Sequence, residues 1–154
     1  MRRKPAVFAI LVGGGIAGLL DITYAVVYSG WFGTPALRIL QSVASGLLGK
    51  AAFDGGLGTA ALGLLLHFLM MLLIAAVYYA ASTRLGLLVR KPLLTGAAYG
   101  VGVYLVMKLL VLPLSAYPFP VHFRPASLLI PDLIVHTSVG LIIALAVRSA
   151  RRPR

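Results

Sequence analysis

The sequence contains no cysteine and no glutamate, and its only acidic residues are Asp21, Asp54 and Asp132. The absence of cysteine excludes disulfides, thiolate metal sites and iron–sulfur clusters. Without cysteine or glutamate, and with no recognisable nucleophile–base pair, the chain offers little for covalent or general acid–base catalysis. We therefore expect a protein that is not an enzyme.

Charge of either sign is scarce: only 11% of the 154 residues are charged, whereas 60% are hydrophobic. Soluble domains carry about 25% charged residues, and a chain this apolar would expose large hydrophobic patches to water. Four apolar runs are each long enough to cross a hydrocarbon layer of ~30 Å as a helix. Because lipid offers no hydrogen-bond partner to the backbone, these runs should be helical. The sequence predicts an all-α, integral membrane four-helix bundle that forms one domain over residues 1–154, with spans at about 6–28, 57–81, 93–112 and 127–147.

The basic residues are distributed unevenly about these spans. Ten of the fourteen fall at the two ends of the chain or between the second and third spans, namely Arg2, Arg3, Lys4, Arg84, Arg90, Lys91, Arg148, Arg151, Arg152 and Arg154. This bias predicts that both termini are cytoplasmic, and it makes anionic lipid headgroups the expected partner rather than nucleic acid. The first run continues to Tyr28 without a small-residue cleavage site, so we expect it to be retained as a span.

The connector between the first two spans has the pattern of a helix over about 35–53. Pro35 can open a helix and Gly55–Gly56 can close one. At helical spacing, apolar residues fall on one face and polar residues on another. The apolar residues are Leu37, Leu40, Ala44, Leu47, Leu48 and Ala51, and the polar residues are Arg38, Gln41, Ser42 and Ser45. This amphipathic pattern favours a helix lying in the membrane interface, with a short re-entrant helix as the alternative.

The connector between the last two spans is rich in proline, with Pro113, Pro118, Pro120 and Pro125. Proline lacks an amide proton, so this stretch should form an extended cap rather than a regular helix. His122 lies in it, and we expect an ordinary surface histidine there.

Each span carries a stripe of small or polar residues spaced three or four apart, which places them on one helix face. Gly14, Gly18, Gly63, Gly100 and Gly140 are the expected helix-packing positions, because small residues let helix backbones approach closely. GGGIAG at 13–18 belongs to this packing pattern, since no strand precedes it. The ionisable or hydroxyl groups on the same stripes form the expected intramembrane polar cluster: Asp21, His67, Tyr104, Lys108, Asp132 and His136.

Counting along each helix places these groups in two layers. Asp21, Lys108 and Asp132 lie nearer the outer surface, and His67 and His136 lie deeper at matching height. If Pro131 is the first helical residue, Asp132 is an N-terminal acid and His136 lies only one turn deeper. Burial disfavours charge, so we expect neutral histidines at pH 7 and at least one aspartate paired with Lys108.

Three roles for the histidines stay open. They can donate interhelical hydrogen bonds to backbone, Thr59 or Tyr104 and only fix the packing. They can pass protons together with Asp132, since imidazole titrates near neutral pH. His67 and His136 are also the candidate ligands of a haem or a metal ion.

Several strings resemble those of a family of small uncharacterised four-span bacterial inner-membrane proteins. They are AGLLDITYA, ILQSVASGLLGKAAFDGGLGTAALGLLLHF and YGVGVYLVMKLLVLPLSA, followed by a histidine in the last span. In layout alone the chain is similar to YagU-like inner-membrane proteins. The resemblance implies the four-span topology and an inner-membrane location, and it implies no activity. It also implies a neutral amide side chain at position 108, and this chain differs there because it has Lys108.

Three function classes follow. The first is a non-enzymatic structural or accessory membrane component that acts through helix packing, with a second copy or another membrane protein as partner. The second is a transporter or channel-like protein that moves protons or a small solute along the Asp/His/Lys stripe. The third is a haem- or metal-binding redox component built on His67 and His136.

Overall fold

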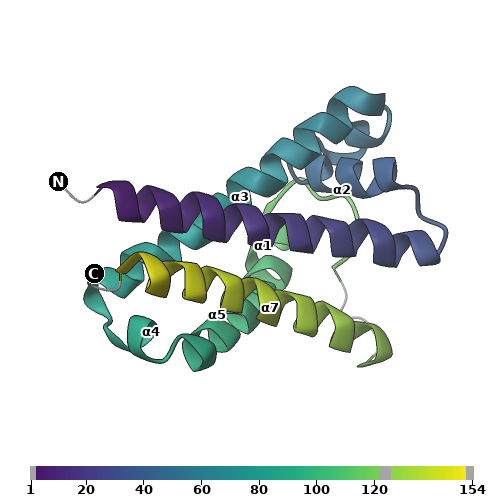
Figure 1. The fold of residues 1–154 in the computed structure, drawn as a ribbon. Helices are drawn as coiled ribbons and strands as arrows, with labels where there is room; N and C mark the ends of the chain where they lie inside the picture. The colour runs from purple at the N-terminus through teal and green to yellow at the C-terminus, as the bar shows by residue number, and fades with distance from the viewer. Residues whose placement is uncertain (1–2, 122–125, 152–154) are drawn as a thin grey trace.

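The computed structural model describes residues 3–121 and 126–151 of the chain, and within these ranges the regular structure is helical, without strands. Figure 1 shows the path of the chain. The elements are α1 (Arg3–Trp31), α2 (Ala36–Leu48), the 3-10 turn η1 (Gly49–Phe53), α3 (Gly56–Arg84), α4 (Leu87–Arg90), α5 (Pro92–Val106), the π-helical segment η2 (Met107–Val111), α6 (Leu112–Leu114) and α7 (Ala126–Arg151).

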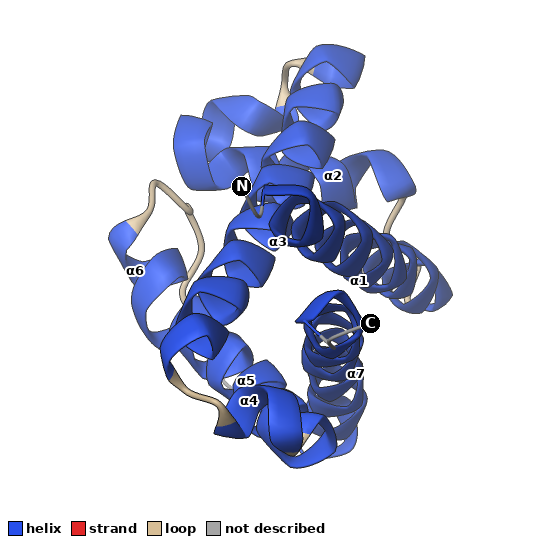
Figure 2. Ribbon diagram, turned by 60° about the vertical axis from the view of Figure 1, so that its left-hand side comes forward, coloured by secondary structure: helices blue, strands red, loops and turns tan. Residues whose placement is uncertain are grey.

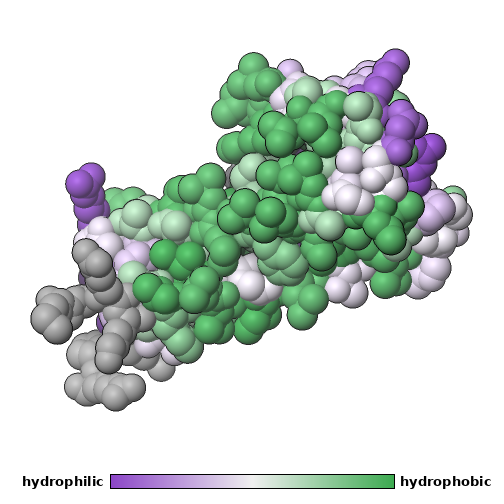
Figure 3. Space-filling model, turned by 90° about the horizontal axis from the view of Figure 1, so that it is seen from above, coloured by the Kyte–Doolittle hydropathy of each residue, from purple (hydrophilic) through white to green (hydrophobic). Residues whose placement is uncertain are grey.

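Four helices are long and apolar enough to cross a membrane, over Pro5–Trp31, Gly56–Arg84, Pro92–Leu114 and Leu129–Arg151. The predicted all-α fold is confirmed, and each of the four predicted apolar runs lies in one of these long helices. Large apolar side chains are exposed along these helices, among them Leu11, Leu19, Leu65, Leu73 and Leu109. Figure 3 shows the resulting belt of hydrophobic residues between the two more polar ends. These features indicate a multi-pass membrane protein, because lipid is the solvent that such a surface requires.

The long helices pack in the order α3–α1–α7–α5, with α2 against the first part of α3. Both termini and α4 lie at one end of the molecule, which we call the terminal end (Figure 1). The α1–α2 turn and η1 lie at the opposite end, which we call the loop end, and residues 115–121 run from the middle of the molecule toward it (Figure 1). Figure 2 shows α1 and α3 on one side and α5 and α7 on the other.

Glycine allows the closest helix crossings. A Cβ atom on Gly100 would collide with the carbonyl of His136, and one on Gly140 would collide with the carbonyl of Gly96, so α5 and α7 are in backbone contact. On α1, a Cβ on Gly14 would lie 3.0 Å from the carbonyl oxygen of Met71, and one on Gly18 would lie 3.0 Å from the ring of Phe68. The structure thus places four of the five predicted packing glycines where α1 meets α3 and α5 meets α7.

The half of the bundle toward the terminal end contains the buried hydrophobic core. Its fully buried residues come from α1, α3 and α7 and are mostly small or aliphatic: Ala9, Ala17, Met71, Ala75, Tyr78, Val139, Ile143, Ala144 and Val147. Hydroxyl groups join the helices there, since Tyr99 donates to the carbonyl of Ile74 at 2.8 Å and Arg151 donates to Ser82 at 2.9 Å. This end of the bundle is therefore tightly closed.

The predicted connector helix exists as α2 followed by η1, and the side of α2 that faces the protein carries Gln41, Ala44 and Ser45. Gln41 is 2% exposed and donates to the carbonyl of Gly56 and to Thr59, at 3.1 and 3.4 Å. α2 packs directly on the fifth predicted packing glycine, Gly63, so closely that a Cβ there would collide with the carbonyl of Leu40. Leu47 and Leu48 point outward, 61% and 41% exposed. The outward side of α2 therefore carries exposed leucines, although Ala44 of the predicted apolar set is buried.

Pro113 and Pro131 lie within helical segments, beyond the first turn. Pro113 has no amide proton for the carbonyl of Leu109, and the turn before it widens, so that Leu112 donates to the carbonyl of Met107 five residues back. α7 begins at Ala126, so the conditional prediction that Pro131 is its first residue is wrong. Asp132 then lies in the second turn, and His136 lies deeper than that start would place it. The predicted surface histidine, His122, lies outside the described residues.

Candidate functional site

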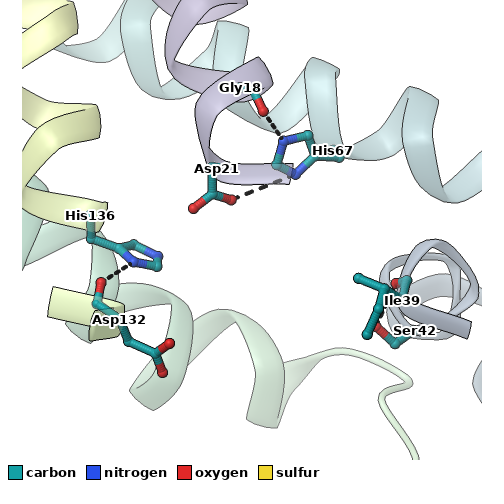
Figure 4. A network of polar contacts seen from close by, with 7 residues as sticks. All are labelled: Gly18, Asp21, Ile39, Ser42, His67, Asp132 and His136. Atoms are coloured by element: carbon teal, nitrogen blue, oxygen red, sulfur yellow. Dashed lines mark hydrogen bonds and ion pairs between the residues drawn. The ribbon is translucent and has the colours of Figure 1, made fainter. Parts of the chain in front are cut away.

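His67 connects α3 to α1 through both nitrogens of its ring. Its Nε2 lies 2.9 Å from the carbonyl oxygen of Gly18, and its Nδ1 lies 4.0 Å from Oδ2 of Asp21 (Figure 4). A carbonyl only accepts, so Nε2 must carry the proton of this hydrogen bond. Nδ1 then faces the carboxylate either with a lone pair, when the ring is neutral, or with a second proton, when it is charged. The side chains of His67 and Asp21 thus lie side by side, one from α3 and one from α1.

His136 is held in the opposite tautomer. Its Nδ1 lies 2.8 Å from the carbonyl oxygen of Asp132 in the preceding turn of α7, so Nδ1 donates. Its ring stands edge-on to that of Tyr104, which is 2% exposed, with centroids 5.1 Å apart. Nε2 is thereby left as the acceptor of the neutral ring. The two predicted histidines thus form hydrogen bonds with different partners, one on α1 and one within α7.

The carboxylate of Asp132 is bound from α1, where Tyr24 donates its hydroxyl proton to Oδ1 at 2.9 Å. Tyr24 is a site residue that the sequence analysis did not single out. It lies three residues after Asp21, which places both on one face of α1, so this spacing could have identified Tyr24 as a site residue. Its position near the end of the first span instead fits the usual belt of interfacial aromatics, and Tyr28, stacked on Tyr24 at 5.1 Å, extends that row.

Three cavities meet at Asp21. The largest, about 480 Å³, lies between α2, α3 and η2 and is lined by Asp21, Ser42, Gly46, His67, Met70, Met107, Ser115 and Tyr117, with apolar side chains between them. A second, about 250 Å³, is lined by Asp21, Tyr24, Tyr104, Lys108, Asp132 and His136. A third, about 70 Å³, is lined by Asp21, His67, Met107 and His136. We call these three spaces together the chamber.

The chamber brings together all six predicted cluster residues. Asp21 lines every part of it, and in Figure 4 the Asp21 carboxylate and the rings of His67 and His136 are directed into the space enclosed by α1, α3 and α7. Met107, at the start of the π-helical segment, also lines all three cavities, and such segments recur at functional sites. The sequence analysis did not identify Met107, because a methionine in an apolar span carries no distinguishing pattern.

Lys108 lies within this segment and lines the second cavity together with Asp21 and Asp132. The pairing of one aspartate with Lys108 stays a prediction. With both carboxylates and the ammonium charged and both imidazoles neutral, the chamber has a net charge of −1. That charge is costly in a low-dielectric interior unless a proton or another cation balances it.

The chamber does not fit the predicted haem. The space that both histidines line is about 70 Å³, well below the ~300 Å³ at which small-molecule pockets begin. A metal ion fits no better, because within residues 3–121 and 126–151 no group of three or more His, Asp or Glu side chains is placed to bind one. The arrangement is suited to exchanging a proton and to receiving a small solute.

The outer wall of the largest cavity is formed by α2 and the segment that follows α6. The amide of Ala116 donates to the carbonyl of Gly46 at 2.8 Å, and Phe119 packs on Phe53 with ring centroids 5.7 Å apart. Arg38 lies over the other side of this contact, 5.0 Å from the centre of the Phe53 ring. Short segments thus border the chamber toward the loop end, and the buried core closes it at the terminal end.

Comparison with protein-family models, with curated proteins and with solved structures gives no match to this chain. The family resemblance set out above therefore stays a prediction, and the functional argument depends on the chamber itself.

Proposed function

We propose that this protein is a transporter-like membrane protein that moves protons, alone or together with a small solute, by way of the chamber. The observation that carries the proposal is that three cavities meet at a single carboxylate, Asp21, with an imidazole nitrogen 4.0 Å away. Ionisable groups are costly in a membrane interior, and they occur there chiefly where ions or protons are handled.

The organisation of the bundle supports this proposal. The chamber occupies the half toward the loop end, whereas the half toward the terminal end is a core of buried residues such as Ala75, Ile143 and Val147. A transporter must close one side of its site while the other is accessible, and a path open at both ends at once would leak. In this proposal the structure corresponds to the state that is closed at the terminal end.

The orientation belongs to the same proposal: a bacterial inner membrane with both termini in the cytoplasm. In the described part of the chain, Arg84, Arg90, Lys91, Arg148 and Arg151 lie at the terminal end, and Arg38 and Lys50 lie at the loop end. This asymmetry favours a cytoplasmic terminal end. The chamber then lies in the outer half of the membrane, and α2 lies near the outer interface.

An accessory role through helix packing has less support in the geometry. The small-residue stripes predicted for such contacts are occupied within the chain, Gly14 and Gly18 by α3, Gly63 by α2, and Gly100 by α7. These glycines are therefore not on a surface that a second copy can use.

The proposal is tested by proton flux into proteoliposomes that contain the full chain, driven by a pH gradient and followed with an enclosed pH-sensitive dye. The measurement is made without solute and with a panel of small amines, carboxylates and sugars. In at least one condition, flux should exceed that of protein-free vesicles, and His67→Gln should reduce it. Flux equal to that of empty vesicles under every condition would contradict the proposal.

A further inference from the structure

The chemistry of the largest cavity defines the class of solute that it can receive. Its size, about 480 Å³, falls within the range of roughly 300–1,000 Å³ typical of small-molecule sites. Most of its wall is apolar, with Val43, Leu47, Leu66, Val111 and Leu112. Such a wall favours a ligand with an apolar body.

The polar groups of this cavity favour a cationic ligand over an anionic one. Asp21 is the one carboxylate among its lining residues, and none of those residues is lysine or arginine. The thioethers of Met70 and Met107 add polarisable surface that adapts to different apolar shapes. An anion would face Asp21 without a cationic partner in this wall, whereas a cation finds its counter-charge there.

The same carboxylate faces Nδ1 of His67, so a cationic solute and the second proton of the imidazole compete for one charge. Titratable groups line the cavities around this pair from every surrounding helix. They are Tyr24 and Tyr28 on α1, Tyr104 on α5, Lys108 on η2, Asp132 and His136 on α7, and Tyr117 in the loop after α6. Asp132 accepts from Tyr24, and Nδ1 of His136 is occupied by its own helix. Nδ1 of His67 is accordingly the position where a proton directly opposes a cation bound at Asp21.

On the premise of the proposed function, we infer that the solute is a small organic monocation with an apolar body, an amine or quaternary ammonium, and that it exchanges for a proton on His67. When the cation binds beside Asp21, the Nδ1 proton of His67 leaves to water and the imidazole becomes neutral. The charge of the chamber is the same before and after the exchange. The cation takes no proton from the protein and forms no covalent bond.

Binding to the detergent-solubilised full chain tests this inference without requiring transport. Isothermal titration calorimetry uses benzyltrimethylammonium as the probe and neopentylbenzene, in which carbon replaces nitrogen, as its uncharged isostere. The wild type should bind the ammonium at about pH 8, and at least about tenfold less tightly at about pH 5.5, because a proton on Nδ1 of His67 competes with the cation for the charge of Asp21. The isostere should bind at least about tenfold more weakly than the ammonium at about pH 8.

Variants assign the effect to the two residues. Asp21→Asn should weaken ammonium binding at least about tenfold, whereas Asp21→Glu should retain it and Asp54→Asn, which removes an exposed carboxylate outside the chamber, should leave it unchanged. His67→Gln keeps an N–H for the carbonyl of Gly18 but has no second proton, so it should bind the ammonium equally well at both pH values.

Equal binding of the ammonium and its isostere by the wild type would overturn the inference, and that comparison needs no variant to fold. A pH-dependent affinity in His67→Gln equal to that of the wild type would overturn the exchange. If binding behaves as expected but no flux is found in vesicles, the cation site stands and the transport proposal fails. If flux is found without cation selectivity, transport stands and the solute class is wrong.

Discussion

The imidazole of His67 donates from Nε2 to the carbonyl of Gly18 and holds Nδ1 4.0 Å from Oδ2 of Asp21. One hydrogen bond thus sets both the orientation of the ring and the nitrogen that faces the carboxylate. Gly18 makes the arrangement possible, because a Cβ at that position would press on the ring of Phe68, the neighbour of His67. The packing of α1 on α3 and the chemistry of the chamber therefore depend on the same contact.

The two histidines should have different tautomers when neutral. Their hydrogen bonds to carbonyls place a proton on Nε2 of His67 and on Nδ1 of His136. Solid-state NMR of protein labelled with ¹⁵N-histidine in lipid, at about pH 8 where a free imidazole is neutral, should show one Nε2–H and one Nδ1–H ring for these residues. The variants His67→Gln and His136→Gln should each remove one set of ring signals, and this loss assigns each tautomer to its residue. The same tautomer for both would contradict the described geometry.

Gly100 should tolerate alanine far less well than Gly102 on the same helix. A Cβ on Gly100 would collide with the carbonyl of His136, whereas one on Gly102 would meet nothing within 4 Å. Overpacking of this kind typically costs about 1–3 kcal/mol, while alanine at an open helix position gains up to ~1 kcal/mol over glycine. Unfolding in mixed micelles should therefore show Gly100→Ala less stable than the wild type and Gly102→Ala at least as stable. Equal stability of the two variants would refute the close α5–α7 crossing.

Removing the hydroxyl of Tyr24 should loosen the contact between α1 and α7. Tyr24→Phe removes the 2.9 Å hydrogen bond to Asp132 and keeps the stacked ring. Hydrogen bonds within membrane proteins contribute about 0.6–2 kcal/mol, so a loss of about 1 kcal/mol is expected in the same unfolding measurement. Tyr28→Phe, one turn further along α1, is the matched control and should cost less. A Tyr24→Phe variant as stable as the wild type would argue against this interhelical bond.

The absence of native cysteine makes the orientation directly measurable. Single cysteines placed at the exposed positions Lys50 and Ser149 mark the loop end and the terminal end. In intact spheroplasts a membrane-impermeant maleimide should label Lys50→Cys, and it should label Ser149→Cys only after permeabilisation. The reverse pattern would place the termini outside, and with them the basic residues of the terminal end.

The helices could be predicted from the sequence because the signal is a long apolar run, and lipid forces such a run to be helical. The glycine spacing likewise marked one face of each span, and Gly14, Gly18, Gly100 and Gly140 lie at crossings between spans. Which helices cross could not be predicted, because every span carries a similar stripe. In the structure α1 contacts both α3 and α7, and this choice joins His67 to Asp21 and Tyr24 to Asp132.

Depth alone was also insufficient to predict the partners of the histidines. Counting residues places His67 and His136 at similar height, and both line the smallest cavity, but height does not specify the direction in which each ring points. The carbonyl of Gly18 sets that direction for His67, and the carbonyl of Asp132 sets it for His136. The chamber itself depends on the placement of α2 and residues 115–117, segments whose amphipathic and proline-rich patterns say little about where they pack.

The central claim is that proton flux by way of the chamber depends on the charge of Asp21, and one pair of isosteric variants tests it most directly. Asp21→Asn and Asp54→Asn each remove one negative charge, the first where three cavities meet and the second at an exposed turn. Both are reconstituted at equal density, and proton flux into the vesicles is compared with that of the wild type. We expect Asp21→Asn to fall to the level of protein-free vesicles and Asp54→Asn to match the wild type. Equal flux through the two variants would contradict the account.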